Sequence, residues 1–263
     1  MAVIEIRNLV KDFGARRIID NVSLQIEKGE TMVIMGGSGC GKSTLLRMMI
    51  GALKPDSGKI FIKEKDVTCL NEDEMDEARK HFGMLFQGAA LFNSMTVGEN
   101  VALPLREHTK LNDTIIGIMV KMKLELVGLT GFEDLKPAEI SGGMKKRVGL
   151  ARAIAMDPEI VFYDEPGAGL DPVMASVIDK LIMDLSRKLG ITSVVVTHEM
   201  GSAFRIADRM AMLHQGRIIE IGTPQEIKDS KNGIIQQFIT GSPDGPIPLR
   251  RSSKDYLKDL MGG

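Results

Sequence analysis

The hydrophobic positions along the chain follow two periods, one typical of strands and one typical of helices. Val22, Leu24 and Ile26 alternate with polar residues, which predicts a half-buried antiparallel strand. Short apolar runs that suit strands buried on both faces are TMVIMG (31–36), GMLFQ (83–87), EIVFYDE (159–165) and TSVVVTH (192–198). Helical spacing separates them in KSTLLRMMIGAL (42–53), MKKRVGLARAIAM (144–156) and VMASVIDKLIMDLSRKL (173–189). This alternation predicts an α/β protein with a parallel sheet and a phosphate site at the carboxyl ends of its strands.

The stretch from 88 to 157 departs from this alternation. It has helical periodicity and no strand pattern, so we expect a helical subdomain (88–157) inserted in a core made of residues 1–87 and 158–240. Gly216 in HQGRIIEIG predicts a late hairpin. Residues 241–263 form a Gly- and Pro-rich tail, either a solvated basic end or a partner-binding extension. Its basic residues are Arg250, Arg251, Lys254 and Lys258.

Composition narrows the function classes. The 263 residues are 43% hydrophobic, enough to bury the core of one large domain. A formal net charge of −1 gives no overall attraction to nucleic acid or anionic lipid, and the lack of Trp argues against a base-stacking platform, so no nucleic-acid partner is expected. No run approaches the roughly 18 apolar residues of a membrane span. A membrane role would therefore require a partner protein.

The segment IMGGSGCGKSTLL (34–46) is the strongest chemical signal. The spacing Gly36-x4-Gly41-Lys42-Ser43, between a predicted strand and a predicted helix, is typical of a loop whose backbone amides hold phosphates. Lys42 supplies a point charge for the outer phosphates, and the Ser43 hydroxyl is a ligand for magnesium. The expected nucleotide-binding residues of this loop are Gly36, Gly37, Ser38, Gly39, Cys40, Gly41, Lys42, Ser43 and Thr44.

Cys40 within this loop has two interpretations. It is a small residue at a variable position, or it is a thiol whose pKa is lowered by the helix N-terminus. The chain has one other cysteine, Cys69, and a pair with no framework indicates reduced thiols and a cytosolic location.

Acidic and histidine side chains end two of the predicted strands. Asp164 and Glu165 follow four apolar residues, so Asp164 can hold magnesium and Glu165, which points the other way, can polarise the attacking water. His198 ends the next apolar run and is expected at the same edge of the sheet.

A second glycine-rich helix start lies at ISGGM. Ser141 can cap a helix whose first amides belong to Gly142 and Gly143, which makes another anion site. One chain with one nucleotide has no use for two such sites. We therefore expect a head-to-tail homodimer in which this segment contacts the nucleotide of the other copy.

Taken in order, these elements resemble the ATPase subunit of ABC transporters, over residues 2 to about 240. The resemblance implies a P-loop NTPase with a RecA-like mixed-sheet core, an antiparallel β subdomain and an inserted helical subdomain, using ATP and Mg2+. It assigns Phe13 to adenine stacking, Gln87 to magnesium, γ-phosphate sensing and coupling to a membrane partner, and Asp171 of GAGLD to the dimer interface. The implied catalytic residues are Glu165, His198, Lys42 and Gln87, and the implied magnesium ligands are Ser43, Gln87 and Asp164.

Met144, where this family commonly has Gln, narrows the resemblance. ISGGMKKR (140–147), the segment 84–109 and the tail are similar to the ATPases of Mla-type, MCE-linked phospholipid transport systems. This resemblance implies a peripheral subunit at the cytoplasmic face of the bacterial inner membrane, in a transporter that maintains outer-membrane lipid asymmetry. The implied partners are a second copy of the chain, an integral membrane permease dimer, a periplasmic MCE-domain lipid-binding ring and a small STAS-domain protein.

Three points stay open at this stage. The motifs also fit a cytosolic ATPase of iron–sulfur scaffold type, or an ABC ATPase for another substrate. The amides at 142 and 143 remain, so Met144 puts in doubt only a polar contact to ribose. The apolar residues that open the helical stretch are either subdomain core or a docking groove for a partner; they are Leu91, Phe92, Met95, Val97, Val101, Leu103 and Leu105.

Overall fold

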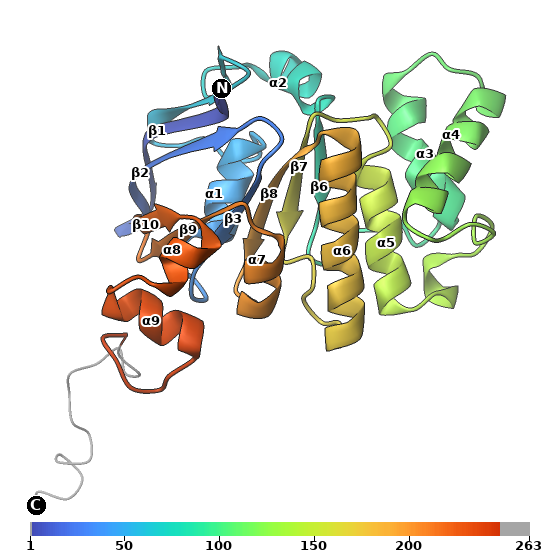
Figure 1. Cartoon of the computed structure of the whole chain (residues 1–263). Coiled ribbons are helices and arrows are strands. Elements are labelled where there is room, and N and C mark those ends of the chain that lie inside the picture. The colour runs from blue at the N-terminus through green and yellow to red at the C-terminus, as the bar shows by residue number, and fades with distance from the viewer. Residues whose placement is uncertain (1, 248–263) are drawn as a thin grey trace, which may run out of the picture.

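Two sheets form the framework of the protein, whose computed structural model describes residues 2–247 (Figure 1). The smaller sheet is antiparallel, in the order β2-β1-β4-β5. Its strands are β1 (Ala2–Phe13), β2 (Arg16–Glu27), β4 (Ser57–Ile62) and β5 (Lys65–Asp66). The basic residues of the tail at 250, 251, 254 and 258 lie outside the described residues.

The larger sheet is mixed and has the order β10-β9-β3-β8-β7-β6. Five of its strands run parallel to one another, from β9 to β6 in this order. The edge strand β10 pairs antiparallel with β9 through the predicted hairpin at Gly216. The strands are β3 (Thr31–Met35), β6 (Phe82–Leu85), β7 (Ile160–Asp164), β8 (Thr192–Thr197), β9 (Arg209–His214) and β10 (Arg217–Gly222). The four predicted apolar runs are all strands, which confirms the α/β fold with a mixed sheet.

Helices cover both faces of the larger sheet, and α1 (Lys42–Met49) packs between it and the smaller one. The long α6 (Pro172–Leu189) lies on the opposite face, beside α5 (Gly142–Ala153) (Figure 1). The other helices are α2 (Glu72–Arg79), α3 (Val97–His108), α4 (Asp113–Leu126), η1 (Pro137–Glu139), α7 (Met200–Ile206), α8 (Pro224–Lys228) and α9 (Gly233–Thr240). Within residues 2–247, no helix has the length and apolarity that crossing a membrane requires.

Strand alternation divides the core into two clusters. Met32 and Ile34 of β3 face the cluster shared with α1 and the smaller sheet, whereas Val33 and Met35 face the cluster shared with α5 and α6. Because successive side chains of a strand point to opposite faces, a strand buried on both faces must be apolar throughout. This explains the uninterrupted apolar runs in the sequence.

The segment 88–157 contains helices and no strand, as its periodicity predicts. Val97 and Val101 of α3 belong to the same hydrophobic cluster as Tyr163 of the sheet, so the helical segment packs on the core. The subdomain boundaries at 87/88, 157/158 and 240/241 stay predictions.

The pattern misses β1, the first strand of the chain. Register shifts follow Ile6 and Leu9, and Asn8 has a φ of 48°, so the two-residue alternation is broken in the middle of the strand. A bulged strand of this kind has no simple period that a sequence can display.

Candidate active site

The glycine loop joins β3 to α1 at the carboxyl edge of the larger sheet. Lys42 is 8% exposed, and its Nζ atom donates to the carbonyl oxygens of Gly36 at 2.8 Å and Gly37 at 3.1 Å. The ammonium group thus turns back into the loop, on the side from which a phosphate would approach. The amides of the first helical turn provide the other half of an anion site.

At two positions of this loop, neighbouring backbone lies so close that only glycine fits. A Cβ on Gly36 would lie 2.2 Å from the carbonyl oxygen of Leu213 in β9, and one on Gly41 would lie 2.9 Å from the carbonyl oxygen of Ile18 in β2. Gly41 also has a φ of 112°, which favours glycine. The loop is therefore held tightly between the two sheets.

Asp164, at the end of β7, lies next to the start of α1. The Ser43 hydroxyl donates to its Oδ1 atom at 3.3 Å. Burial raises the pKa of Asp164 and is the largest cause of its shift. The hydrogen bond from Ser43 acts in the opposite direction and lowers the pKa by a smaller amount. A half-buried carboxylate beside a hydroxyl, next to the phosphate loop, is an oxygen donor set that suits a magnesium ion shared with phosphates. These residues therefore fit the metal that the sequence implies.

Glu165 has a separate set of partners. Its Oε1 atom lies 2.9 Å from Nδ1 of His198, and its Oε2 atom accepts from the Thr197 hydroxyl at 3.1 Å and from the His198 amide at 3.3 Å. Its φ of 48° turns the chain just after the strand. Residues at the end of β8 therefore fix the orientation of the Glu165 carboxylate, which directly follows β7 in the chain.

These side chains surround a pocket with a volume of about 780 Å³. The expected residues that line it are Phe13, Gly37, Ser38, Gly39, Gly41, Lys42, Ser43, Thr44, Gln87, Glu165 and His198. Gly36, Cys40 and Asp164 are not part of this lining. The sequence analysis missed three residues that are, namely Arg16, Ile18 and Phe238. Arg16 follows the turn after Phe13, and this nearness was its only signal; nothing marked Phe238.

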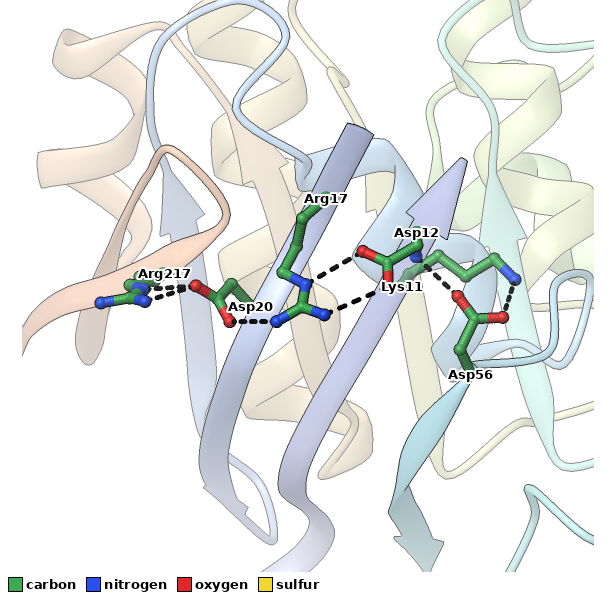
Figure 2. A network of polar contacts seen from close by, with 6 residues as sticks. All are labelled: Lys11, Asp12, Arg17, Asp20, Asp56 and Arg217. Carbon is green, nitrogen blue, oxygen red and sulfur yellow. Dashed lines mark hydrogen bonds and ion pairs between the residues drawn. The ribbon is translucent and has the colours of Figure 1, made fainter. Parts of the chain in front are cut away.

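Phe13 ends β1 and is 52% exposed at the pocket rim. The Nζ atom of Lys11 lies 5.6 Å from the centre of its ring, a cation–π contact. A chain of charged side chains crosses β1 and β2 near this ring and connects them to β10 and to the loop before β4 (Figure 2). Its members are Lys11, Asp12, Arg17, Asp20, Asp56 and Arg217.

The chain of charges braces the turn that carries Phe13. Arg17 joins Asp12 at 3.0 Å to Asp20 at 3.4 Å, and Asp56 accepts from the Asp12 amide at 2.6 Å. Exposed ion pairs contribute little stability individually. What they do here is connect the end of β1, where Phe13 lies, with β2, β10 and the loop before β4.

The structure argues against a lowered pKa for the Cys40 thiol. The side chain is buried in the cluster beneath the loop, and burial raises its pKa; the nearby Lys42 lowers the pKa by a smaller amount. This direction favours the other interpretation, in which Cys40 is a small residue at a variable position of the loop.

Ser141, Gly142, Gly143 and Asp171 do not line the pocket of their own chain. Ser141 caps α5 by accepting from the Met144 amide at 3.3 Å, and Asp171 caps α6 by accepting from the amides of Val173 and Met174 at 3.0 Å each. The two helix starts touch, since a Cβ on Gly143 would lie 2.6 Å from Cε of Met174. They form one surface, separate from the pocket.

The larger sheet is mixed, and a glycine loop precedes α1. Asp164 contacts the first turn of that helix, and Glu165 after β7 pairs with His198 after β8. Together these features define a P-loop nucleoside triphosphate hydrolase. A family model described as "ABC transporter" matches residues 19–168. The chain belongs to this family, and it is an ATPase that binds ATP.

Two groups of relatives match most of the chain. The intermembrane phospholipid transport system ATP-binding protein MlaF of Haemophilus influenzae is 43% identical over 259 residues, which cover 98% of both chains. The probable ribonucleotide transport ATP-binding protein mkl of Mycobacterium leprae is 44% identical over 246 residues, covering 94% of this chain and 71% of that protein.

Solved structures agree with the fold. A dimeric ATP-binding cassette in a post-hydrolysis state with ADP and Pi has a TM-score of 0.78 and 31% identity, over 84% of this chain and 98% of that one. The cbiO1 protein of Clostridium perfringens, part of an ABC transporter complex, has a TM-score of 0.81 and 30% identity, over 88% of this chain and 92% of that one.

Proposed function

We propose that this ATPase powers the transport of phospholipid between membranes, as one of two copies docked on a membrane permease. The assignment of phospholipid as the transported substrate rests on the extent of the match to the Haemophilus influenzae phospholipid transport protein. That match covers 98% of both chains, well beyond the cassette at 19–168. The mycobacterial relative, whose name gives ribonucleotide transport, leaves more than a quarter of its own length unmatched.

In this proposal each copy binds ATP in the pocket beneath Phe13. The ring of Phe13 stacks on adenine, and the loop amides with Lys42 hold the phosphates. Glu165, held by Thr197 and His198, accepts a proton from the water that attacks the γ-phosphorus as the bond to the ADP oxygen breaks. His198 keeps the carboxylate in place and contacts the γ-phosphate.

The residues that would hold magnesium are Ser43, Gln87 and Asp164. The ion supplies positive charge to the phosphate oxygens. The chain provides the orientation: the Ser43 hydroxyl and the Asp164 carboxylate are already in contact, whereas Gln87 lies on an exposed loop of the pocket.

The second copy completes the site. We infer a head-to-tail dimer in which Ser141, Gly142 and Gly143 of one copy close over the γ-phosphate of the other. Three features support this. The helix start is capped by Ser141, it does not line the pocket of its own chain, and it contacts the helix that begins after Asp171. Asp171 then lies at the interface between the copies.

A groove next to Gln87 suits the permease. Its volume is about 390 Å³, and Phe86 and Phe92 in its lining are 44% and 50% exposed. Phe92 and Leu103 are the groove members of the apolar set that the sequence left open, while Val97, Val101 and Leu105 are buried in the core. An exposed apolar groove one residue from Gln87 would let a permease segment move the loop that contacts ATP.

A second apolar surface lies on α4 and on the segment just before it, and we assign it to the small STAS-domain protein. Its members recur at helical spacing and are between 38% and 59% exposed. They are Leu111, Ile115, Ile118, Met122 and Leu126. With both partners in place, the chain sits at the cytoplasmic face of the inner membrane, and the MCE-domain ring lies on the periplasmic side of the permease.

Affinity purification of the tagged chain from detergent-solubilised membranes tests this function. We expect a permease, an MCE-domain protein and phospholipid to co-purify. ATPase activity should require the permease-bound form and should disappear in the Lys42→Ala variant. Recovery with iron–sulfur or other cytosolic proteins alone would overturn the transport assignment. If a ribonucleotide rather than phospholipid stimulated the ATPase, the transported substrate would be a ribonucleotide and the phospholipid assignment would be wrong.

A further inference from the structure

Lys146, in the second turn of α5, is a buried lysine to which the proposed mechanism gives no role. It is 5% exposed, and its Nζ atom donates to the backbone carbonyl of Gln87 and, at 3.2 Å, to that of Glu165. One ammonium group therefore joins the loop after β6 to the loop after β7. These two loops carry the residues assigned to γ-phosphate sensing and to water activation.

A cation in this place has a cost. Burial lowers the pKa of Lys146, and the charges of Asp164 and Glu165 raise it by a smaller amount. An apolar side chain would fill the same space without losing hydration. What the lysine adds is a directed donor to two backbone segments at once.

The same face of α5 holds the rest of the Gln87 loop, which we define as residues 86–90. Arg152 donates to the carbonyl oxygens of Ala89 at 2.7 Å and Ala90 at 2.8 Å. Between the two cations, a Cβ on Gly149 would lie 3.1 Å from Cβ of Ala89, so the helix presses directly on the loop. Residues 146, 149 and 152 are three apart and share one helix face. The backbone of the Gln87 loop is therefore held to one face of α5 at three carbonyl groups.

The proposed dimer places the N-terminal end of α5 on the nucleotide of the partner copy. Ser141 lies five residues before Lys146, a distance of about 7.5 Å along a helix at 1.5 Å per residue. In the proposed dimer, Ser141 contacts the ATP of the partner copy, while Lys146 contacts Gln87 and Glu165 of its own site. A rigid helix of this length transmits a displacement from one end to the other.

We propose that Lys146 is a positioning residue that links the two ATP sites of the dimer. Through α5 it fixes the placement of Gln87 and Glu165 in its own site together with the placement of Ser141 over the partner copy's ATP, so the two sites depend on each other. This inference rests on the proposed dimer and on the proposed role of Glu165.

Mixed dimers of full-length chains with two different tags, purified in the assembled transporter, test the link. Copy 1 carries Glu165→Gln, so hydrolysis is confined to the site built on the loop, Gln87 and Glu165 of copy 2. Lys146→Met is then added either to copy 2 or to copy 1. In copy 1 it leaves every residue of the active pocket unchanged and alters only the helix that lends Ser141.

We expect both placements to lower kcat by about tenfold or more, with little change in KM for ATP. Lys146→Arg, which keeps the donors, should restore most of the rate. The control is Lys145→Met, a partly buried neighbour on the same helix, which should have no such effect. The split between kcat and KM and the rescue by arginine distinguish positioning from a general loss of folding.

A loss confined to Lys146→Met in copy 2 would overturn the link between sites, and no loss in either placement would overturn the whole inference. The dimer with Glu165→Gln in both copies separates this failure from that of the proposed function. If that dimer still hydrolyses ATP, the role of Glu165 is wrong; if it is inactive, the result for Lys146 stands by itself.

Discussion

Asp164 and Glu165 are neighbours in the chain, but their side chains have different surroundings. Asp164 faces the Ser43 hydroxyl under the phosphate loop, and Glu165 faces Thr197 and His198 at the end of β8. Because successive side chains at a strand end point in opposite directions, one pair of acids can serve two tasks. The first carboxylate suits a cation, and the second suits a proton.

The role of Glu165 predicts a separation of binding from chemistry. Glu165→Gln keeps the size of the side chain and its contacts but removes the base, so ATP affinity should stay within a few-fold while kcat falls by roughly 10²–10³-fold. Single-turnover hydrolysis and equilibrium ATP binding measure the two effects. The matched control is Glu159→Gln, which changes an acid next to the opposite end of β7 that pairs with Lys63 on the surface. An equal loss in both variants would contradict the assignment.

Asp171 distinguishes a helix cap from an interface residue. Asp171→Ala removes the acceptor for two amides of α6 and should lower the free energy of unfolding by about 1 kcal/mol. Asp171→Asn keeps a capping oxygen without the charge, so its stability should be near that of the natural chain. If dimer formation is nevertheless weakened in Asp171→Asn, the charge acts at the interface. Chemical denaturation and light scattering give the two measurements.

At the scale of elements, short helices near the chain's end contribute to the pocket. Phe238 of α9 lines the pocket together with residues of the glycine loop and is partly buried against the larger hydrophobic cluster. The element that follows the last strand therefore contributes to the nucleotide site, more than 190 residues after Lys42 in the sequence.

Phe238 should affect nucleotide affinity more than turnover. Phe238→Ala removes apolar surface from the pocket wall, so KM for ATP should rise by several-fold while kcat changes little. Titration with a fluorescent ATP analogue measures the affinity. Phe132→Ala, an aromatic residue of the helical segment outside the pocket lining, is the control. An unchanged affinity in Phe238→Ala would show that α9 does not contact the nucleotide.

The sequence predicted those parts of the fold and site that have a local signature. Apolar runs buried on both faces, the glycine loop, and the acids and histidine at strand ends depend only on neighbouring residues and on the rule that parallel strands end at one edge. Lys146 and Phe238 were missed because their roles depend on packing between distant segments. Three basic residues follow Met144, and nothing in their order distinguishes the one that is buried.

At the scale of the whole molecule, the proposed function uses three separate surfaces for three neighbours. In that proposal the starts of α5 and α6 would face the second copy, the groove beside Phe86 and Phe92 would face the permease, and the exposed apolar side of α4 would face another protein. The pocket lies at the carboxyl edge of the larger sheet, where Lys42, Glu165 and His198 are part of its lining. The larger sheet and the helices on its two faces can be followed in Figure 1.

The groove can be tested without altering the ATP site. Phe92→Glu places a charge in an apolar contact and should prevent co-purification with the permease, while ATP binding by the chain stays unchanged. Phe132→Glu, with a comparable exposed ring in another place, should leave assembly intact. An intact complex with Phe92→Glu would exclude the groove as the docking surface.

The hydrogen bonds between α5 and the Gln87 loop also limit which changes of sequence and length the loop can accept. Lys146 and Arg152 bind carbonyl oxygens of Gln87, Ala89 and Ala90, so they recognise the course of the backbone rather than the identity of the side chains. The exposed position 88 can then change its side chain to suit a proposed permease partner, whereas Ala90, also exposed, has a φ of 49° that limits the residues it accepts. The length of the loop is not free, because one inserted or deleted residue would move every carbonyl out of register with the helix.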